Sequence, residues 1–385
     1  MLHFLRADTP SVRRFNFLQR VSFSYISTKL CVVPERAYLK LSGLDTKKFL
    51  QGVTTNDLSL LKVGGDCLAT AFLTPKGRIL SDAIIYDVTG TIAGSGTEPT
   101  VIIETHSSFQ DALSKFLSLY RLRAKLTIQI ATNFRTRILF SEQKGNIDIH
   151  KGDTLVINVV DPRHSSLGNR LLYQTDILCE SSATDMQFDV EIYKRYRMLN
   201  GLAEGPELEG LIPLEANLDL LNYISFSKGC YVGQELIART KHKGLVRKRI
   251  VPFLSNGMKM NGFNTLESSV GHSALIEKLN EVELQHKNSH SLLARGAALG
   301  LENSSSDSDV KLPTSEEDKI GEILSLTAAG DIGMAKVSLK YAYGARSLCA
   351  VSDDRSAVPI AIYKPKWWPE VDTVTGKRLD DPSTY

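Results

Sequence analysis

Several signatures that would assign a chemistry directly are missing from this chain. No apolar run approaches the roughly 18 residues that a membrane-spanning helix needs, so the sequence predicts no membrane span. No G-x-G-x-x-G or G-x-x-x-x-G-K-S/T motif follows an expected strand, so the usual dinucleotide- and phosphate-binding loops are not indicated. The five cysteines are widely spaced and form no C-x-x-C pair. A zinc ribbon, a thioredoxin-type site and a self-contained cluster-binding motif are therefore not expected.

The 385 residues have the composition of an ordinary globular protein, with 42% hydrophobic and 23% charged residues. A chain of this length predicts two or three structural units. Its net charge of +3 is unevenly spread, because residues 1–29 carry five basic residues and one acid. This Arg-rich segment, with serines and interleaved Phe and Leu, is typical of a mitochondrial transit peptide, and it predicts a protein of the mitochondrial matrix with free thiols. A basic tail that binds acidic surfaces is the alternative.

The polarity pattern from residue 30 onward predicts an α+β fold. Residues 36–42 alternate as a strand, and Asp45 is expected to cap a short helix after it. The strands CLATAFL and RILSDAIIYD are joined by Thr74-Pro75-Lys76-Gly77, a turn sequence that predicts a hairpin. A strand VIIETH, an amphipathic helix SSFQDALSKFLSLYRL and a strand KLTIQIA follow.

The rest of the chain repeats this mixture and then changes character. Strands are expected at TRILF, LVINVV and RLLYQ, and a helix at DMQFDVEIYKRYRMLNG, which ends at Gly201. From about residue 246, short strands and Gly-marked turns predict a barrel-like all-β module. The predicted units are therefore 30–245 and 246–385, and a polar, Ser- and acid-rich tract at about 278–318 predicts a disordered loop insertion in the second.

The stretch FSKGCYVGQELIART, residues 226–240, surrounds one thiol with polar groups. Lys228 and a helix expected to start near Val232 would both favour the thiolate form of Cys230, which can ligate iron or act as a nucleophile. A small residue buried in a tight turn is the alternative. Gly229 and Gly233 are expected to permit close approach of the backbone. Tyr231 is expected either to stack on a ligand or to fill the core. Gln234 and Glu235 are expected to orient neighbouring groups or to cap the helix.

A basic run follows this stretch, with six cations and no acid within eleven residues. Such a run binds phosphates, a folate glutamate tail, RNA or an acidic partner face, and a solvated loop is the alternative. Its members are Arg239, Lys241, Lys243, Arg247, Lys248 and Arg249.

The motif KGCYVGQE resembles the signature of folate-binding proteins of the YgfZ type, relatives of the glycine-cleavage T-protein. Further segments are similar to this family in the expected order: FLQGVTTNDLSLL at 49–61, AFLTPKGRILSD at 71–82 and IPLEANLDLLNYISF at 212–226. The ending KPKWWPE at 364–370 resembles the family's mitochondrial iron–sulfur cluster assembly branch. The resemblance covers roughly residues 36–370 and implies a T-protein-like folate-binding fold with a C-terminal β-barrel module.

The resemblance also implies tetrahydrofolate as a cofactor. It assigns Glu215 to the folate, because a carboxylate accepts the adjacent N–H donors of a pterin edge as a pair; a structural carboxylate is the alternative. The T-protein has an acidic residue near folate at a place that here falls on Asp82 or Ser81, and an asparagine where this chain has Glu104. These departures argue against T-protein chemistry. The other implied cofactor-binding residues are Lys228, Gly229, Tyr231, Gly233, Gln234, Glu235 and Arg239.

Three functional hypotheses follow from the motif and the resemblance. The leading one is an assembly factor for 4Fe–4S proteins, in which Cys230 shares an iron–sulfur cluster with an A-type scaffold protein and serves recipient enzymes indirectly. The second is a folate-dependent one-carbon, aminomethyl-type transferase with Asp82 as its acid. The third, an RNA-binding factor linked to tRNA modification, rests on the basic run; no RRM, KH or zinc-knuckle motif accompanies it, so direct nucleic-acid binding ranks last.

Overall fold

The computed structural model describes residues 30–92, 96–139, 153–175, 183–255, 297–301, 320–328, 330–342, 348–351, 357–362, 364, 365, 368 and 370. The predicted transit peptide, Cys179 and most of the predicted insertion lie outside the described residues. Within the described part of the chain, no helix is long and apolar enough to cross a membrane.

The first sheet is antiparallel, with strand order β3-β4-β5-β2-β6. Its strands are β2 (Arg36–Ser42), β3 (Asp66–Leu73), β4 (Ile79–Asp87), β5 (Thr100–His106) and β6 (Thr127–Ile130). On one face the helices α1 (Thr46–Val53) and α2 (Gln110–Arg121) bury their apolar sides against alternate strand residues such as Leu39 and Ile103. The short helices η2 (Leu58–Leu60) and η3 (Ser107–Phe109) flank them. Because side chains alternate along a strand, the opposite face is left for a second layer.

The predicted hairpin is confirmed, and the prediction for Asp45 is wrong in its detail. β3 and β4 pair through Thr74–Gly77, where Gly77 has a φ of 76° and its N–H donates to the Thr74 carbonyl at 2.8 Å. Asp45 occupies the N-cap position of α1 but makes no capping hydrogen bond. Its carboxylate instead accepts from the backbone N–H of Lys125 at 2.7 Å, because the chain after α2 returns beside the start of α1.

The second sheet supplies the second layer, with antiparallel order β1-β7-β9-β8. Its elements are β1 (Leu30–Val32), β7 (Phe134–Leu139), β8 (Asp153–Val160), β9 (Asn169–Thr175) and the short helix η4 (Ser165–Leu167). The core between the sheets joins Ile84 and Ile102 of the first sheet with Ile138 and Leu172 of the second. The helix α3 (Ala183–Leu199) packs against β1. Gly201, the predicted stop residue, follows its last turn with a φ of 65°.

The C-terminal unit is a closed barrel of order β10-β13-β12-β11-β14-β15, which confirms the predicted module. Its strands are β10 (Lys248–Ser255), β11 (Ala298–Leu301), β12 (Gly321–Leu326), β13 (Ile332–Ser338), β14 (Leu348–Val351) and β15 (Ala357–Ile362), with the short helix α6 (Leu339–Ala342). The strand β11 lies within residues 278–318, which the sequence predicted to be a disordered loop insertion. That prediction is therefore wrong for Ala298–Leu301. The apolar segment ALGL pairs with β12 and β14, and Leu299 is fully buried in the barrel core.

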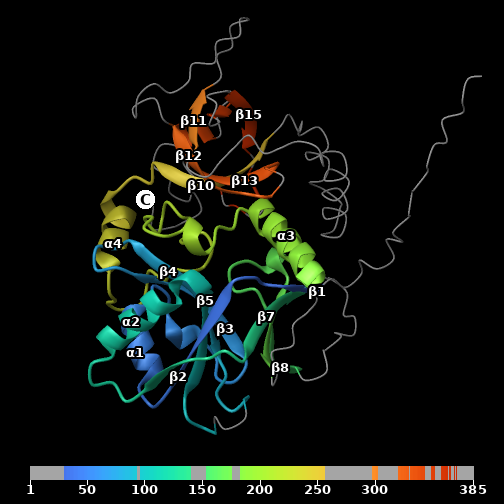
Figure 1. Cartoon of the computed structure of the whole chain (residues 1–385). Helices are drawn as coiled ribbons and strands as arrows, with labels where there is room; N and C mark the ends of the chain where they lie inside the picture. Colours follow the sequence, from blue (N-terminus) through green and yellow to red (C-terminus); the bar gives the residue numbers. More distant parts are fainter. Residues whose placement is uncertain are drawn as a thin grey trace, which may run out of the picture.

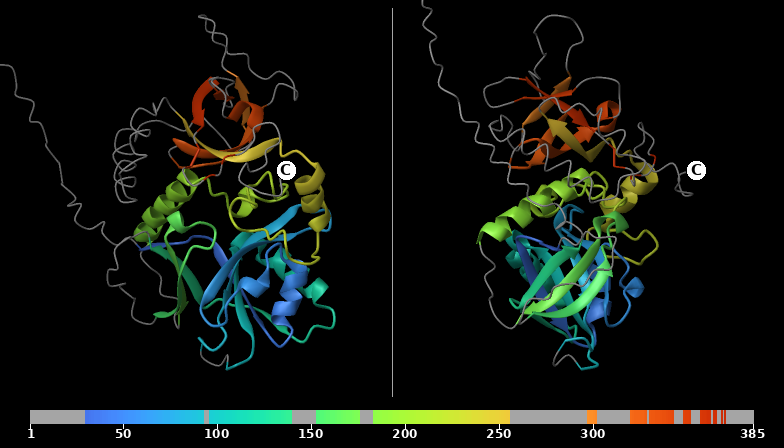
Figure 2. Two further views of the ribbon diagram at one scale, coloured as in Figure 1. Left: turned by 180° about the vertical axis from the view of Figure 1, so that it is seen from behind. Right: turned by 90° about the vertical axis from the view of Figure 1, so that its right-hand side faces the viewer.

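α3 lies between the barrel and the sheets, as the views in Figure 1 and Figure 2 show. Arg195 of α3 forms a two-pronged ion pair with Asp331 at the start of β13, at 2.8 and 3.1 Å. A Cβ on Gly201 would lie only 3.1 Å from Pro365 and 3.4 Å from the Trp368 ring. The C-terminal segment therefore closes tightly against the end of α3.

Candidate functional site

Cys230 is exposed on a turn that precedes the helix α4 (Gln234–Lys243). The other described cysteines, Cys31, Cys67 and Cys349, are buried, and burial raises the pKa of Cys67 above the range in which a thiolate forms. Among the described residues, Cys230 is therefore the cysteine that a partner can reach.

Lys228 does not direct its ammonium to the thiol. Its Nζ donates to the carbonyls of Gln51 at 2.7 Å, Thr54 at 2.7 Å and Asn56 at 2.9 Å. An ammonium has three N–H donors, so all of them are occupied at the end of α1. Burial lowers the pKa of Lys228 to about 8, against the raising effect of Asp57. Among the described contacts Lys228 thus makes no hydrogen bond to Cys230, and its ammonium is held at the end of α1.

Gly233 joins the Cys230 turn to the β3–β4 hairpin. It caps α4 with a φ of 79°, and a Cβ there would lie 2.5 Å from the Thr74 carbonyl oxygen. Gly77 faces it across the same contact. The close approach predicted for Gly233 is therefore present, whereas a Cβ on Gly229 would meet no atom within 4 Å.

The remaining residues of the motif divide into internal supports and surface groups. Tyr231 packs against the core between the sheets, its ring lies 4.9 Å from the Lys228 ammonium, and burial raises its pKa to about 12. Gln234 accepts the backbone N–H of Tyr231 at 3.1 Å through its side chain. The helix α4 begins at Gln234, two residues later than predicted, and Glu235 is exposed in its first turn.

The surface beside Cys230 is aromatic and basic. Phe226 is 43% exposed, and Lys241 of α4 covers its ring at 3.7 Å. Arg239 and His242 line a shallow hollow along α4. The predicted basic run is wrong in one member, because Arg249 is buried, pairs with Asp219 at 2.9 Å and donates to the Leu214 carbonyl. Arg249 thus fastens the start of the barrel to the loop at 212–226.

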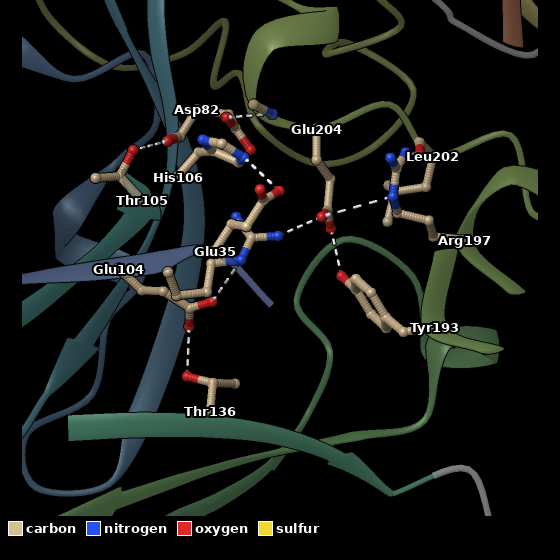
Figure 3. A network of polar contacts seen from close by, with 12 residues as sticks. Glu35, Asp82, Glu104, Thr105, His106, Thr136, Tyr193, Arg197, Leu202 and Glu204 are labelled. Carbon is tan, nitrogen blue, oxygen red and sulfur yellow. Dashed lines mark hydrogen bonds and ion pairs between the residues drawn. The ribbon is translucent and has the colours of Figure 1, made fainter. Parts of the chain in front are cut away.

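A buried network of charges lies between the two sheets (Figure 3). Glu204 accepts from the guanidinium groups of Arg36 and Arg163 and from the Tyr193 hydroxyl at 2.6 Å. Burial alone would raise the pKa of Glu204, but Arg36, Arg163 and Arg197 outweigh it and hold that pKa well below its usual range. Glu204 is therefore ionised and fully paired in the interior.

Glu104 forms the second centre of this network. Its carboxylate accepts from Tyr86 at 2.6 Å, Thr136 at 2.8 Å and Arg170 at 2.5 Å, and Arg36 lies 3.4 Å away. Desolvation opposes ionisation, yet the arginines lower the pKa of Glu104. Three hydrogen bonds and the Arg36 ion pair thus hold this carboxylate inside the network.

Sequence reasoning named Glu104 but missed the rest of the network. Its members come from distant segments, so no local motif joins them. The available signal was strand alternation: Arg36, Tyr86 and Arg170 share the inward face of their strands with core residues. A charged side chain at such a position predicts a buried partner of opposite charge.

Asp82 and Ser81 face opposite sides of the first sheet, which separates the two alternatives for the acidic position. The Ser81 hydroxyl lies 2.6 Å from that of Thr105, on the side of α1 and α2. Asp82 points between the sheets, where it accepts the Gly205 N–H of η5 (Gly205–Glu207) at 3.0 Å. Burial raises the pKa of Asp82, although Arg36 opposes this. Of the two candidates, Asp82 is thus the residue on the sheet face that carries the buried charge network.

The residues fit a folate only in part. The Tyr223 hydroxyl is buried without a hydrogen-bond partner and lies within the electrostatic reach of Asp82. The second oxygen of Asp82 and the half-buried Glu215 carboxylate accept no hydrogen bond from any described residue. Tyr223 thus offers a buried unsatisfied hydroxyl to a heteroaromatic ring, and Asp82 and Glu215 offer acceptor oxygens. Glu215 lies in the loop that meets β10, where its carbonyl accepts the Ile250 N–H at 3.0 Å.

The chain is similar to known proteins in both sequence and structure. No family model matches the chain. It is 34% identical over 271 residues to the iron–sulfur cluster assembly factor IBA57 homolog, mitochondrial, of Mycosarcoma maydis, with 64% of this chain and 65% of that protein covered. The homolog of Dictyostelium discoideum is 29% identical over 387 residues, covering 88% and 94%. Human mitochondrial IBA57 is 36% identical over 235 residues, covering 56% and 64%.

The matches to the fungal and human proteins thus span just under two thirds of those relatives. Among solved structures, the glycine cleavage system aminomethyltransferase T from Bartonella henselae superposes with a TM-score of 0.58 over 91% of this chain and 88% of that one, at 11% identity. This similarity shows a T-protein-like fold, and with the closed barrel it confirms the fold predicted from the sequence.

Proposed function

The chain belongs to the family of mitochondrial iron–sulfur cluster assembly factors that includes IBA57, and we propose from this membership that it assists the maturation of 4Fe–4S proteins in the mitochondrial matrix. The observation that carries the proposal is the exposed thiol of Cys230 on a turn tied to two other elements. A thiolate is a soft ligand suited to iron.

Cys230 acts in this proposal as one ligand of a cluster whose other ligands come from a partner. Among the described residues, no group of three or more His, Cys, Asp or Glu side chains is arranged to hold a metal ion. The partner we propose is an A-type iron–sulfur scaffold protein, and recipient enzymes obtain the cluster from that complex. The cluster is thus a cargo received at the turn.

The test is to mix the full chain anaerobically with a cluster-loaded A-type scaffold and to follow complex formation and the visible iron spectrum. Wild type should give a stable iron-bearing complex, and Cys230→Ser should lose the iron from it. Ser227→Ala is the matched control, since Ser227 is exposed on the same turn. An equally stable iron-bearing complex with Cys230→Ser would refute the proposed role.

Tetrahydrofolate is a second element of the proposal. The family's fold supplies the reason to expect it, and when bound it supplies one-carbon or redox chemistry. Asp82, Tyr223 and Glu215 would hold it, because Tyr223 offers a buried unsatisfied hydroxyl and the two carboxylates offer acceptor oxygens. Calorimetric titration with tetrahydrofolate should detect binding to wild type and weaker binding to Glu215→Gln. Equal affinity for the two proteins would remove Glu215 from the site.

A folate-dependent transferase is the second candidate function, and Asp82 is the observation that favours it. Asp82 is a buried carboxyl whose pKa burial raises, the direction that favours an acid catalyst. If the chain is such an enzyme, it should turn over tetrahydrofolate with an amine donor, and Asp82→Asn should abolish turnover. Persistent absence of turnover across a range of amine donors would exclude the transferase function and leave the assembly role as the one proposed function.

A further inference from the structure

The side chain of Lys228 closes the carboxyl end of a helix that lies 172 to 177 residues earlier in the chain. The last turn of a helix presents carbonyls without intrahelical partners, and α1 has no basic residue in its last turn. The carbonyls of Gln51, Thr54 and Asn56 converge on the Lys228 ammonium at 2.7 to 2.9 Å. Lys228 thus supplies the cation that the negative end of a helix dipole favours.

The backbone on both sides of Cys230 is tied to the same end of α1. The N–H of Val232 donates to the Gly52 carbonyl at 3.1 Å, and the N–H of Ser225 donates to the Thr55 carbonyl at 3.1 Å. Lys228 lies between these two ties and Cys230 follows it by two residues. The exposed thiol is therefore carried by a short span whose two ends are fixed.

A lysine suits this place better than an arginine. Three carbonyls meet at one point, and a compact ammonium with three rotatable donors can satisfy all of them, whereas a planar guanidinium fork cannot. The Tyr231 ring covers another side of the ammonium at 4.9 Å. Asp57 and Tyr231 are the titratable groups that face Lys228 from the elements around it.

We propose that Lys228 is the positioning residue for Cys230: by capping α1 it fixes where the thiol meets a cluster held by a partner. This inference rests on the proposed function. It differs from a general stabilising role, because it predicts a change in the geometry of the cluster's ligands as well as in the stability of the turn.

The experiment compares wild type, Lys228→Met and Lys228→Arg in the full chain, with Lys115→Met, at an exposed position of α2, as the control. Three quantities are measured: hydrogen exchange in residues 51–57, the rate of Cys230 alkylation by iodoacetamide, and the visible circular dichroism of the complex with a cluster-loaded A-type scaffold. Lys228→Met should exchange at least about tenfold faster, alkylate at an altered rate and give a changed cluster spectrum. Lys228→Arg should restore none of these, and Lys115→Met should match wild type.

The outcomes separate this inference from the proposed function. Wild-type exchange and a wild-type spectrum in Lys228→Met would overturn the positioning role. If Lys228→Met does not fold, Lys228→Arg decides, and a folded Lys228→Arg with wild-type exchange and spectrum would also overturn it. If wild type accepts no cluster at all, the proposed function fails, while exchange and alkylation still decide whether Lys228 positions Cys230.

Discussion

Glu204 shows how a single buried charge helps to keep the interior of this protein in place. Two arginines and a tyrosine contact its carboxylate directly, and its side chain is 5% exposed. A buried ion pair adds little over well-packed apolar residues, but removing one partner leaves an uncompensated charge. The network therefore specifies how the two sheets face each other.

Glu204→Gln should lower the free energy of unfolding by about 3–5 kcal/mol at pH 7, because Arg36 and Arg163 would each lose a buried counterion and keep only one other carboxylate, Glu104 and Asp161 respectively. Urea denaturation measures the change. Glu209→Gln, at an exposed position nearby, is the control and should stay within about 0.5 kcal/mol of wild type.

The pH dependence of this effect has a definite sign. The folded pKa of Glu204 is held well below its unfolded value of 4.5, so its stabilising contribution is complete above that value and is lost as the pH falls through the folded pKa. The gap between wild type and Glu204→Gln should therefore narrow in denaturation curves taken below about pH 4.5. A gap that stays constant on acidification would contradict the ionised, paired state.

The Cys230 turn and the β3–β4 hairpin approach each other at two glycines. Gly233 of the Cys230 turn and Gly77 of the hairpin approach so closely that neither tolerates a Cβ, and both have a positive φ. The turn, the hairpin and the start of α4 thus form one packed unit.

Gly233→Ala should destabilise the protein by about 1–3 kcal/mol and change the alkylation rate of Cys230, because the Cβ would strain the left-handed backbone and press on Thr74. Gly229→Ala, where a Cβ meets nothing within 4 Å, should leave both nearly unchanged. Thermal unfolding and iodoacetamide labelling measure the two effects. Equal effects of the two substitutions would show that close approach at Gly233 is unimportant.

The barrel strand β11 carries a second prediction at this scale. Leu299→Ala should cost about 2–5 kcal/mol, since Leu299 is fully buried among barrel residues. Leu245→Ala, at a 46% exposed position, is the control and should cost far less. Urea denaturation distinguishes a true barrel strand from the loop that the surrounding sequence suggests; a negligible cost at Leu299 would favour the loop.

Local pattern predicted most of these elements, and tertiary contacts decided what it could not. The hairpin at Thr74–Gly77 and the helix that ends at Gly201 were predicted because turn chemistry and amphipathic period are local signals. β11 was missed because four apolar residues inside a long polar tract carry too little periodicity to stand out. The role of Asp45 was misassigned because its partner, Lys125, is 80 residues away.

The residues of the candidate site likewise divide into those that the local sequence predicts and those that depend on tertiary contacts. Cys230 could be named from its motif, because the crowding of polar residues is visible in the sequence. The partners of Lys228 could not, since three backbone carbonyls have no sequence signature. The buried network was likewise invisible, as its charges are scattered from Arg36 to Glu207.

At the scale of the whole molecule, α3 couples the barrel to the two sheets. The pair Arg195–Asp331 crosses this boundary, and Asp331 also accepts from the Thr327 hydroxyl at 2.6 Å. Both groups are nearly inaccessible to water, with 4% and 5% of their side chains exposed. The pair therefore links the stability of the two units.

Arg195→Met should separate the unfolding of the barrel from that of the sheets, since it leaves Asp331 buried without its cation, at a cost of about 3 kcal/mol. Both tryptophans of the chain lie at 367 and 368, so fluorescence reports the C-terminal unit while far-ultraviolet circular dichroism reports the whole. The two signals should coincide during heating of wild type and diverge in the variant. Coincident curves in Arg195→Met would indicate that other contacts carry the coupling.

The ties between α1 and the Cys230 turn also set an order of events during folding. They join residues more than 170 positions apart, and contacts of such long sequence separation form late because closing the loop is costly. A growing chain exposes its N-terminal part first. The carbonyls at the end of α1 therefore lack their Lys228 partner until the Cys230 turn forms. The thiol is thus held in its final place only in a molecule whose N-terminal part has already folded.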